Sequence, residues 1–400
     1  MKEKINKIAE TIKEDLIAFT RQLISIPSFG GMEAEVVQRL KIEMQKIGYD
    51  RIWVDDFGNL LGIIGKGDRL IAIDGHCDTV GIGNADSWQL DPFSGTCQDG
   101  IIYGRGASDQ KGGLAAAIYA GKIIKEIGLP SNTSLLVVAS VLEEDYEGLC
   151  WKYIIEKDNI KPEAVLLTEP SDLGIMIGQR GRMEIKIQTT GVSCHGSAPE
   201  RGENAIYKML PIIKEIEELN NALTGSALLG KGSVAVTGIH SSAPSLCAVP
   251  DSAFIHLDRR LSESESLETV LAQISQLPSV QKYGAQIIVP EYAIQTYTGL
   301  KCKIKAYYPM WLMNEMHPLV QTAKSAYHDQ FSELARLSAW DFSTNGVATK
   351  GIFNIPTIGF GPGNESHAHT AQDQVKASDL LAAVKFYSAF IYQWSHTFSR

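Results

Sequence analysis

Residues 70–80 read LIAIDGHCDTV, an apolar run that ends in a histidine and an aspartate. The pattern returns at 134–145, where SLLVVASVLEED runs into acidic residues, and at 164–170, where AVLLTEP ends in glutamate and proline. Between the first two runs, the apolar spacing of residues 112–128 predicts a helix. Apolar strands that alternate with helices predict an α/β fold, in which a mostly parallel sheet has helices on both faces. The polar residues that follow the strands then meet at one edge of the sheet.

The chain has 400 residues, 44% of them hydrophobic, and this length exceeds what one hydrophobic core usually organises. Over residues 181–295 the pattern changes to strands of alternating apolar and polar side chains, in the order β-α-β-β-α-β. That order is the ferredoxin-like pattern of a small α+β domain with one solvated sheet face. We therefore predict a large domain built from residues 1–180 and 296–400, with residues 181–295 inserted as a second domain.

The charge balance excludes several classes of partner. Lys and Arg number 37 against 46 Asp and Glu, a net charge of −9 without a basic run, so we expect neither nucleic acid nor an anionic membrane surface as partner. The charged N-terminus MKEKINKIAETIKEDLIAF differs from a secretory signal, and no stretch has the ~20 apolar residues of a membrane span. We expect a cytoplasmic protein with a small soluble substrate. The six cysteines lack CxxC spacing and are expected to be reduced.

Two candidate metal ligands precede the predicted helix at 112–128. His76 and Asp78, in GHCDTV, are two residues apart, so on an extended backbone they point the same way. A carboxylate there can hydrogen-bond the second imidazole nitrogen and orient His76 as a ligand, although such pairs are more often structural. Asp109, in YGRGASDQKGG, lies between glycines, and one rigid carboxylate can bridge two cations about 3.5–4 Å apart. The alternative for Asp109 is an N-cap of the helix.

Acidic residues and histidines after the later strands complete the candidate set. Glu143 and Glu144 are adjacent and cannot face one point in a regular strand, so one could bind metal while the other takes a proton. Lone EED clusters are usually solvated loop charges. Glu169 follows a strand-like apolar run, where an unpaired carboxylate is costly. GFGPGNESHAHTAQD offers His367 and His369, and either could be a ligand or a surface residue.

Together these motifs resemble the aminoacylase / acetylornithine deacetylase / succinyl-diaminopimelate desuccinylase family of co-catalytic, di-zinc metallopeptidases. The resemblance covers the whole chain and rests on GHCDTV, GRGASDQKGG, EED, TEP and the AH that follows GPG. LCWKYIIEKDNIKPE, GQRGRMEI, SCHGSAPERGENAI and FSTNG are most similar to a subgroup of hydrolases linked to selenium metabolism and anaerobic purine breakdown. The resemblance implies a zinc-peptidase-like catalytic domain and an inserted ferredoxin-like lid and dimerisation domain.

The family pattern implies two metal sites that share one carboxylate. Asp109 would bridge two divalent ions, zinc in the first place, with manganese or cobalt as alternatives. His76 and Glu169 would complete one site. Glu144 and His369 would complete the other, because the family pattern places the last ligand in the AH that follows GPG.

Residues beside the ligands would carry out the chemistry that the resemblance implies. Glu143 would be the general base, which deprotonates the bridging water and later protonates the leaving amine, and Asp78 would orient the ligand histidine. His195, in SCHGSAPE, matches a histidine that in dimeric members reaches the partner's active site and stabilises the oxyanion. An ordinary surface histidine is the alternative. Arg260, in HLDRRL, matches an arginine that binds a substrate carboxylate, with Arg259 as its solvent-facing neighbour.

The chain departs from the family pattern near these motifs. Cys77 replaces an aliphatic residue and Gln110 a methionine, and strand alternation points Cys77 away from the metals, as a small core residue. Asn345, in STNG, stands where many members carry aspartate, at the expected rim of the substrate site. Its neighbours Ser343 and Thr344 would also bind substrate, or form a turn. These departures bear on the substrate and leave the five ligands intact.

We predict an enzyme that hydrolyses a linear N-acyl or N-carbamoyl amide bond in a small amino-acid derivative. The resemblance implies a homodimer formed through the inserted domain. The alternative function is a dipeptidase or aminopeptidase on the same scaffold. A remote alternative is a non-catalytic binding module, which should have lost Glu143 or a ligand, whereas all are present.

Overall fold

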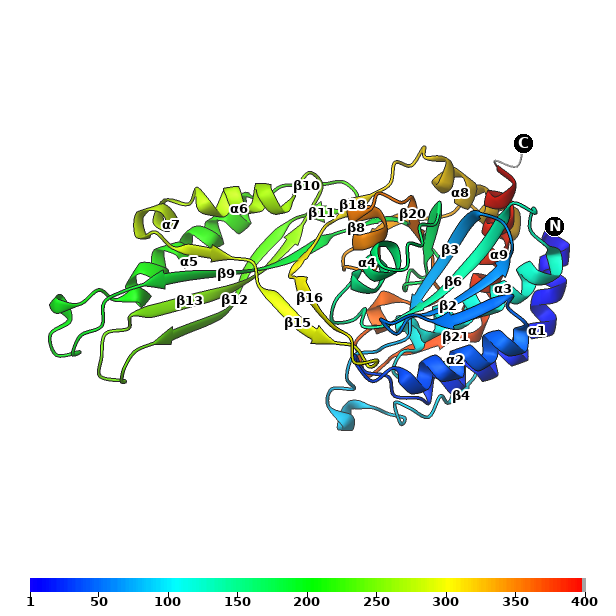
Figure 1. The fold of residues 1–400 in the computed structure, drawn as a ribbon, viewed down its shortest axis with the longest axis horizontal. Helices are drawn as coiled ribbons and strands as arrows, with labels where there is room; N and C mark the ends of the chain where they lie inside the picture. Colours follow the sequence, from blue (N-terminus) through cyan, green and yellow to red (C-terminus); the bar gives the residue numbers. More distant parts are fainter. Residues whose placement is uncertain (398–400) are drawn as a thin grey trace.

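A nine-stranded sheet forms the centre of the larger of two lobes (Figure 1). The computed structural model describes residues 1–397, and the strands of this sheet are β1 Arg51–Val54, β2 Leu60–Gly65, β3 Arg69–His76, β6 Thr133–Ser140, β7 Ala164–Leu167, β8 Ile175–Gln179, β18 Trp311–Leu312, β19 Leu337–Trp340 and β20 Thr357–Gly359. Their order is β1-β2-β6-β3-β7-β20-β8-β18, with β19 beside β8. The central strands β6, β3, β7 and β20 pair in parallel, and antiparallel pairs flank them on both sides. The predicted α/β fold is confirmed, with a sheet that is parallel at its centre and mixed overall.

Helices cover this sheet because its central strands are apolar on both faces. The helices of this lobe are α1 Lys2–Ile24, α2 Ala34–Ile47, α3 Gly112–Ile127, α4 Leu149–Glu156, α8 Pro318–Phe331 and α9 Ala377–Thr397. The most buried of them, α3, packs on β3 and β6 and against α1 and α9. Its small residues allow a close approach, since a Cβ on Gly113 would lie 2.3 Å from the carbonyl oxygen of Thr168. The start of α3 therefore lies against the carboxyl end of β7.

The smaller lobe has its own hydrophobic core, between a sheet and three helices. Its main elements are β9 Gly181–Thr190, α5 Ala205–Ala222, β12 Ser233–Ser242, β13 Ser252–Leu261, α6 Leu267–Ser275, α7 Pro278–Tyr283 and β14 Gln286–Ile288. The antiparallel order β12-β13-β9-β14 is that of the ferredoxin-like pattern. Most residues of β9 and β13 alternate between buried and half-buried, because the helices cover only one sheet face.

Short strands connect and extend the two lobes. They are β4 Cys97–Gln98, β5 Ile101–Tyr103, β10 Gly225–Ser226, β11 Gly230–Lys231, β15 Glu291–Gln295, β16 Lys301–Lys305, β17 Tyr307–Tyr308 and β21 Gln374–Lys376. The hairpin of β15 and β16 lies between the lobes (Figure 1), and its Ile294 belongs to the core of the larger one. The division of the chain at residue 295 stays a prediction.

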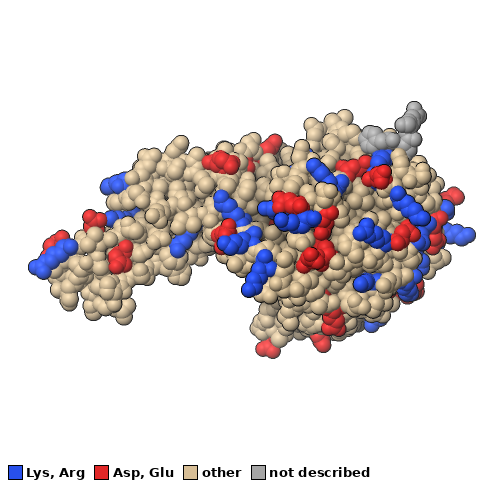
Figure 2. All heavy atoms as spheres, viewed as in Figure 1, with Lys and Arg blue, Asp and Glu red and all other residues tan. Residues whose placement is uncertain are grey.

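Figure 2 shows lysine and arginine side chains interspersed with acidic ones over the visible face, so neither sign of charge dominates there. Across residues 1–397, no helix combines the length and the apolar character needed to cross a membrane.

Candidate metal centre

Three adjacent strands of the parallel centre end at candidate ligands. His76 is the last residue of β3, Glu143 and Glu144 follow β6, and Glu169 follows β7. Parallel strands present their carboxyl ends at one edge of the sheet, so residues far apart in sequence meet there. Nε2 of His76 lies 3.9 Å from a carboxylate oxygen of Glu143 and equally far from one of Glu169.

Asp109 lies between two histidines. It comes from η2 (Ala107–Lys111), the turn before α3, and its Oδ1 is 3.1 Å from Nε2 of His76. Nε2 of His369 is 3.5 Å from Oδ2 of Asp109 and 2.9 Å from Oε2 of Glu144. His369 has a φ of 58°, a left-handed conformation that is rare in non-glycine residues and clusters at functional sites. The two oxygens of one carboxylate thus face different histidines, as a bridging ligand requires.

The cluster fits divalent metal ions. The candidate donor atoms form two groups, and within each group all atoms lie within 4.8 Å of one another. One group is His76 with Glu143 and Glu169, and the other is His76 with Asp109 and Glu144. Imidazole nitrogen and carboxylate oxygen suit zinc and related metals. Oε1 of Glu143 is buried without a hydrogen-bond partner in the described part of the chain, which is costly for a carboxylate. Glu143, predicted as an unligated base, therefore lies within one donor group.

The pKa values in the cluster reflect its concentration of carboxylates. Burial, with neighbouring carboxylates, raises the pKa of Glu143 and of Glu169 well above the usual value. Burial lowers the pKa of His76, but the charge of Glu169 and the hydrogen bond to Asp109 outweigh it and raise that pKa well above normal. Hydrogen bonds to Asp109 and a second carboxylate raise the pKa of His369 to about 10. Protons therefore balance part of the negative charge in the metal-free protein.

Metal binding is expected to strengthen as the pH rises through neutrality and to release protons. Both histidines bind a proton more tightly in the metal-free fold than free imidazole does, and they must lose it to become ligands. The tighter proton binding of the two histidines stabilises the metal-free protein fully when the pH is below the pKa of free imidazole. This stabilisation is lost as the pH rises through the pKa of each histidine in the folded protein, about 10 for His369. Calorimetric titration with Zn²⁺ at pH 7 in two buffers of different protonation enthalpy should show at least about one proton released. A buffer-independent heat would contradict this.

Asp78 contacts His76 through its backbone carbonyl oxygen, whereas the sequence predicted a contact through its carboxylate. Nδ1 of His76 lies 2.9 Å from the backbone carbonyl oxygen of Asp78, whereas the carboxylate Oδ1 is 3.7 Å away. Oδ2 of Asp78 instead accepts the backbone N–H of Glu144 at 3.0 Å. The carbonyl therefore orients the imidazole, and the carboxylate holds the loop that carries Glu144. Cys77, which lies between His76 and Asp78 in the sequence, is buried in the core, as expected from strand alternation.

Asp373 holds the turn that carries Asp109. Its buried carboxylate accepts the N–H of Ser108 at 2.8 Å, the N–H of Gly106 at 2.7 Å and Nη1 of Arg105 at 3.1 Å. Because Asp373 lies on the loop that follows His369, it connects the segments that carry two of the candidate ligands. The sequence motifs do not show this role, because two of the three donors are backbone N–H groups and all three lie about 265 residues away in the chain.

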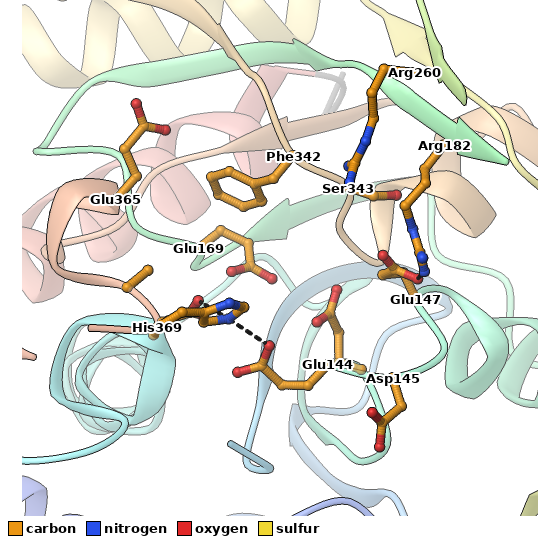
Figure 3. Close-up of a pocket in the computed structure, with 13 residues that line it drawn as sticks. Glu144, Asp145, Glu147, Glu169, Arg182, Arg260, Phe342, Ser343, Glu365 and His369 are labelled. Carbon is orange, nitrogen blue, oxygen red and sulfur yellow. Dashed lines mark hydrogen bonds and ion pairs between the residues drawn. The ribbon is translucent and has the colours of Figure 1, made fainter. Parts of the chain in front are cut away.

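A cavity of about 530 Å³ opens at the cluster (Figure 3). Arg182 on β9 and Arg260 on β13 point into it from the smaller lobe, and Phe342 and Glu365 lie on another side. Ser343 also lines it. The size suits a small molecule. Arg260 and Ser343 were predicted from the sequence, whereas Arg182, Phe342 and Glu365 were not, although all three lie within the motifs quoted above.

Asn345 and Thr344 are buried and do not line the cavity, so the structure does not place these two predicted substrate-binding residues there. Asn345 is 1% exposed, and its Nδ2 donates to Asp74 at 2.8 Å and to Ser140 at 3.0 Å. Its Oδ1 accepts a backbone N–H at 2.9 Å. An amide suits this position because it can donate to the buried carboxylate of Asp74, which a second carboxylate could not do unless protonated. Thr344 is also buried, and of the three predicted residues only Ser343 lines the cavity.

The smaller lobe places its candidate residues on different surfaces. Arg259 was predicted to face solvent, but it is buried. It lies on the helix-covered face of β13 and pairs there with Glu265. Arg260 lies on the opposite face, where its Nε and Nη2 donate to Asp258. His195 is exposed and does not line the cavity within this chain.

Comparisons with known proteins agree with this geometry. The model of peptidase family M20/M25/M40 matches residues 72–393. The chain is 46% identical over 389 residues to uncharacterized protein YgeY of Escherichia coli (strain K12), which covers 97% of this chain and 96% of the relative. It is 30% identical over 247 residues, 55% of this chain and 59% of the relative, to probable succinyl-diaminopimelate desuccinylase of Staphylococcus aureus (strain MRSA252). The structure of aminopeptidase PepT from Bacillus cereus is similar with a TM-score of 0.74 at 20% identity, covering 95% of this chain and 98% of that one.

Proposed function

This chain belongs to peptidase family M20/M25/M40 and is a metal-dependent hydrolase of amide bonds, and on that premise we propose that it cleaves a linear N-acyl or N-carbamoyl bond in a small amino-acid derivative. The observation that carries the proposal is the cluster of histidines and carboxylates in a cavity that two arginines also line. The desuccinylase named above, an N-acyl hydrolase by its name, supports the same reading.

Two divalent ions, zinc in the first place, are proposed to bind at the cluster. Asp109 would bridge them, because its two oxygens face different histidines. His76 and Glu169 would hold one ion. Glu144 and His369 would hold the other. When bound, the ions would polarise the scissile carbonyl and lower the pKa of water towards ~7.

Glu143 is proposed to move the proton. Burial raises its pKa well above the usual value, so it holds a proton more readily than a free glutamate does. Its buried Oε1 makes no hydrogen bond with residues 1–397 and can accept one from water. A carboxyl group of this kind can take the proton of the attacking water and return it to the leaving amine.

Arg260 is proposed to bind the carboxylate of the substrate. Two of its nitrogens are held by Asp258, two residues away on the same strand, while Nη1 makes no hydrogen bond with the described residues. The guanidinium is about one-third exposed and lines the cavity. It can therefore form a charge-assisted bond to an anionic group of a small substrate.

A peptidase is the second candidate function, and Glu365 favours it. This carboxylate lines the cavity away from the arginines (Figure 3), and no ion pair holds it within residues 1–397. It could bind the free α-ammonium group of a dipeptide, which N-acyl and N-carbamoyl derivatives of a monoamino acid lack. The structural similarity to an aminopeptidase is compatible with this alternative.

The two candidate functions are distinguished by measuring amine or ammonia release from N-acetyl, N-succinyl, N-carbamoyl and dipeptide substrates. The protein is loaded with zinc, manganese or cobalt for this experiment. Turnover confined to N-acyl or N-carbamoyl substrates supports the proposal and names the acyl group. Turnover confined to dipeptides replaces it with the second candidate. Absence of metal binding would overturn both.

We further propose that the protein forms a homodimer through the smaller lobe, and that His195 of each chain reaches the partner's cavity and stabilises the oxyanion there. In residues 1–397 the edge strand β12 pairs only with β13, and apolar side chains are exposed on it and on α5, namely Ile239 (54%), Tyr207 (70%) and Leu210 (53%). Sedimentation velocity at micromolar concentration should show a dimer that Ile239→Lys dissociates, with loss of turnover. A fully active monomer would contradict this.

A further inference from the structure

A largely buried ion pair joins the two lobes beside the cluster. Arg182, on β9, donates from Nη2 to Oε2 of Glu147 at 2.8 Å, with side chains 18% and 10% exposed. Glu147 lies three residues after Glu144, on the loop that follows β6. Nη1 of Arg182 donates to Glu184 at 3.1 Å, and its guanidinium lies 4.4 Å from the ring centre of Tyr308. These contacts hold Arg182 in one orientation.

A second contact between the lobes starts from Glu184. Its carboxylate accepts the hydroxyl hydrogen bond of Tyr292, on β15, and lies 3.1 Å from Nε2 of His256. The ring of Tyr292 packs on the core of the larger lobe. Strand β9 follows β8 of the larger lobe directly in the chain, and these two side-chain contacts attach it further, one of them to the loop that carries Glu144.

Arg260 lies directly opposite Arg182 in the register of β13 and β9. Opposed residues in an antiparallel pair have Cα atoms about 4.5–5.5 Å apart, and like charges there repel unless each is neutralised. Glu147 and Glu184 neutralise Arg182, and Asp258 neutralises Arg260. The two arginines differ in freedom, because only Arg182 is attached to the larger lobe. The Glu147–Arg182 pair therefore links the strand pair that carries Arg260 to the loop that carries Glu144.

We propose that the Glu147–Arg182 pair sets the distance between Arg260 and the metal cluster, and so selects substrates by the number of bonds between the scissile amide and the carboxylate. This inference rests on the proposed function, in which Arg260 binds the carboxylate. A substrate longer by one methylene cannot place both its amide and its carboxylate correctly, and such a difference is typically worth about 10- to 200-fold in kcat/KM. Arg182 is thus a positioning residue.

The test compares Arg182→Met with Lys186→Met on two substrates of the active class that differ by one methylene, such as an N-acyl α-amino acid and the matching β-amino acid. Lys186 is the matched control, because it lies on the same face of β9 with its Nζ 3.8 Å from the ring centre of Phe254, in the smaller lobe. The wild type and Lys186→Met should prefer one length by about tenfold or more. Arg182→Met should prefer it by less than about threefold. Adding Glu147→Gln to Arg182→Met should change nothing more, because the two residues act as one unit.

Hydrogen exchange of the metal-free variants tests the attachment without turnover. Backbone amides of residues 142–148 should exchange faster in Arg182→Met than in the wild type or Lys186→Met. Unchanged exchange overturns the proposal, and so does faster exchange with an unchanged length preference. A wild type that cleaves no substrate of any class contradicts the proposed function instead, and the exchange experiment then decides whether the pair joins the lobes.

Discussion

Replacement of Glu143 by glutamine is expected to lower kcat by at least about 10³-fold while the metal ions stay bound. The amide has nearly the shape of the carboxyl group but cannot take the proton of the attacking water. The folded protein should be at least as stable, because the substitution removes a buried carboxylate whose pKa burial and Glu169 raise. Steady-state rates, metal content by emission spectroscopy and urea unfolding measure the three quantities.

Glu156→Gln is the matched control for this variant. Glu156 is the exposed last residue of α4, on the segment that follows the same loop, and its replacement should leave the rate and the metal content unchanged. Loss of a metal ion together with activity in Glu143→Gln would contradict a role limited to proton transfer. It would assign Glu143 to the donor group that it forms with His76 and Glu169.

Replacement of Asp109 by asparagine is expected to reduce the bound metal from two ions per chain to less than one and to abolish measurable turnover. An amide offers one oxygen and no charge, so it cannot bridge two cations between His76 and His369. The loss of affinity should exceed the ~10- to 100-fold that follows loss of an outer-shell partner. Metal content after dialysis at fixed free Zn²⁺ measures it.

Asp86→Asn, on the exposed turn η1 (Ala85–Ser87), controls for the loss of one carboxylate from the chain. It should retain both ions and full activity. If Asp109→Asn also retained two ions with unchanged affinity, Asp109 would not be the shared ligand. The N-cap role considered for Asp109 is not available as an alternative, because Lys111 is the N-cap of α3.

Much of the candidate site could be predicted because each of its residues lies in a local motif. His76 ends one apolar strand, Glu143 and Glu169 follow two others, and the α/β pattern alone implies that adjacent strand ends meet. For Asp78 the sequence predicted the correct residue but not the accepting atom, which is the carbonyl oxygen rather than the carboxylate. Residue type and spacing do not say which of two acceptors on one residue a neighbour reaches, since a shift of less than 1 Å decides it.

By itself the sequence determined the alternation of strands and helices, the ferredoxin-like order of the smaller lobe and the set of candidate ligands. Only the tertiary structure decided that Arg260 faces the cavity while Arg259 is buried, and that Asn345 is buried and donates a hydrogen bond to Asp74. Only the tertiary structure also brought Arg182 to Glu147. The physical reason is that a strand pattern shows which residues share a face, whereas the packing of helices and of the second lobe decides which face is buried and what it meets.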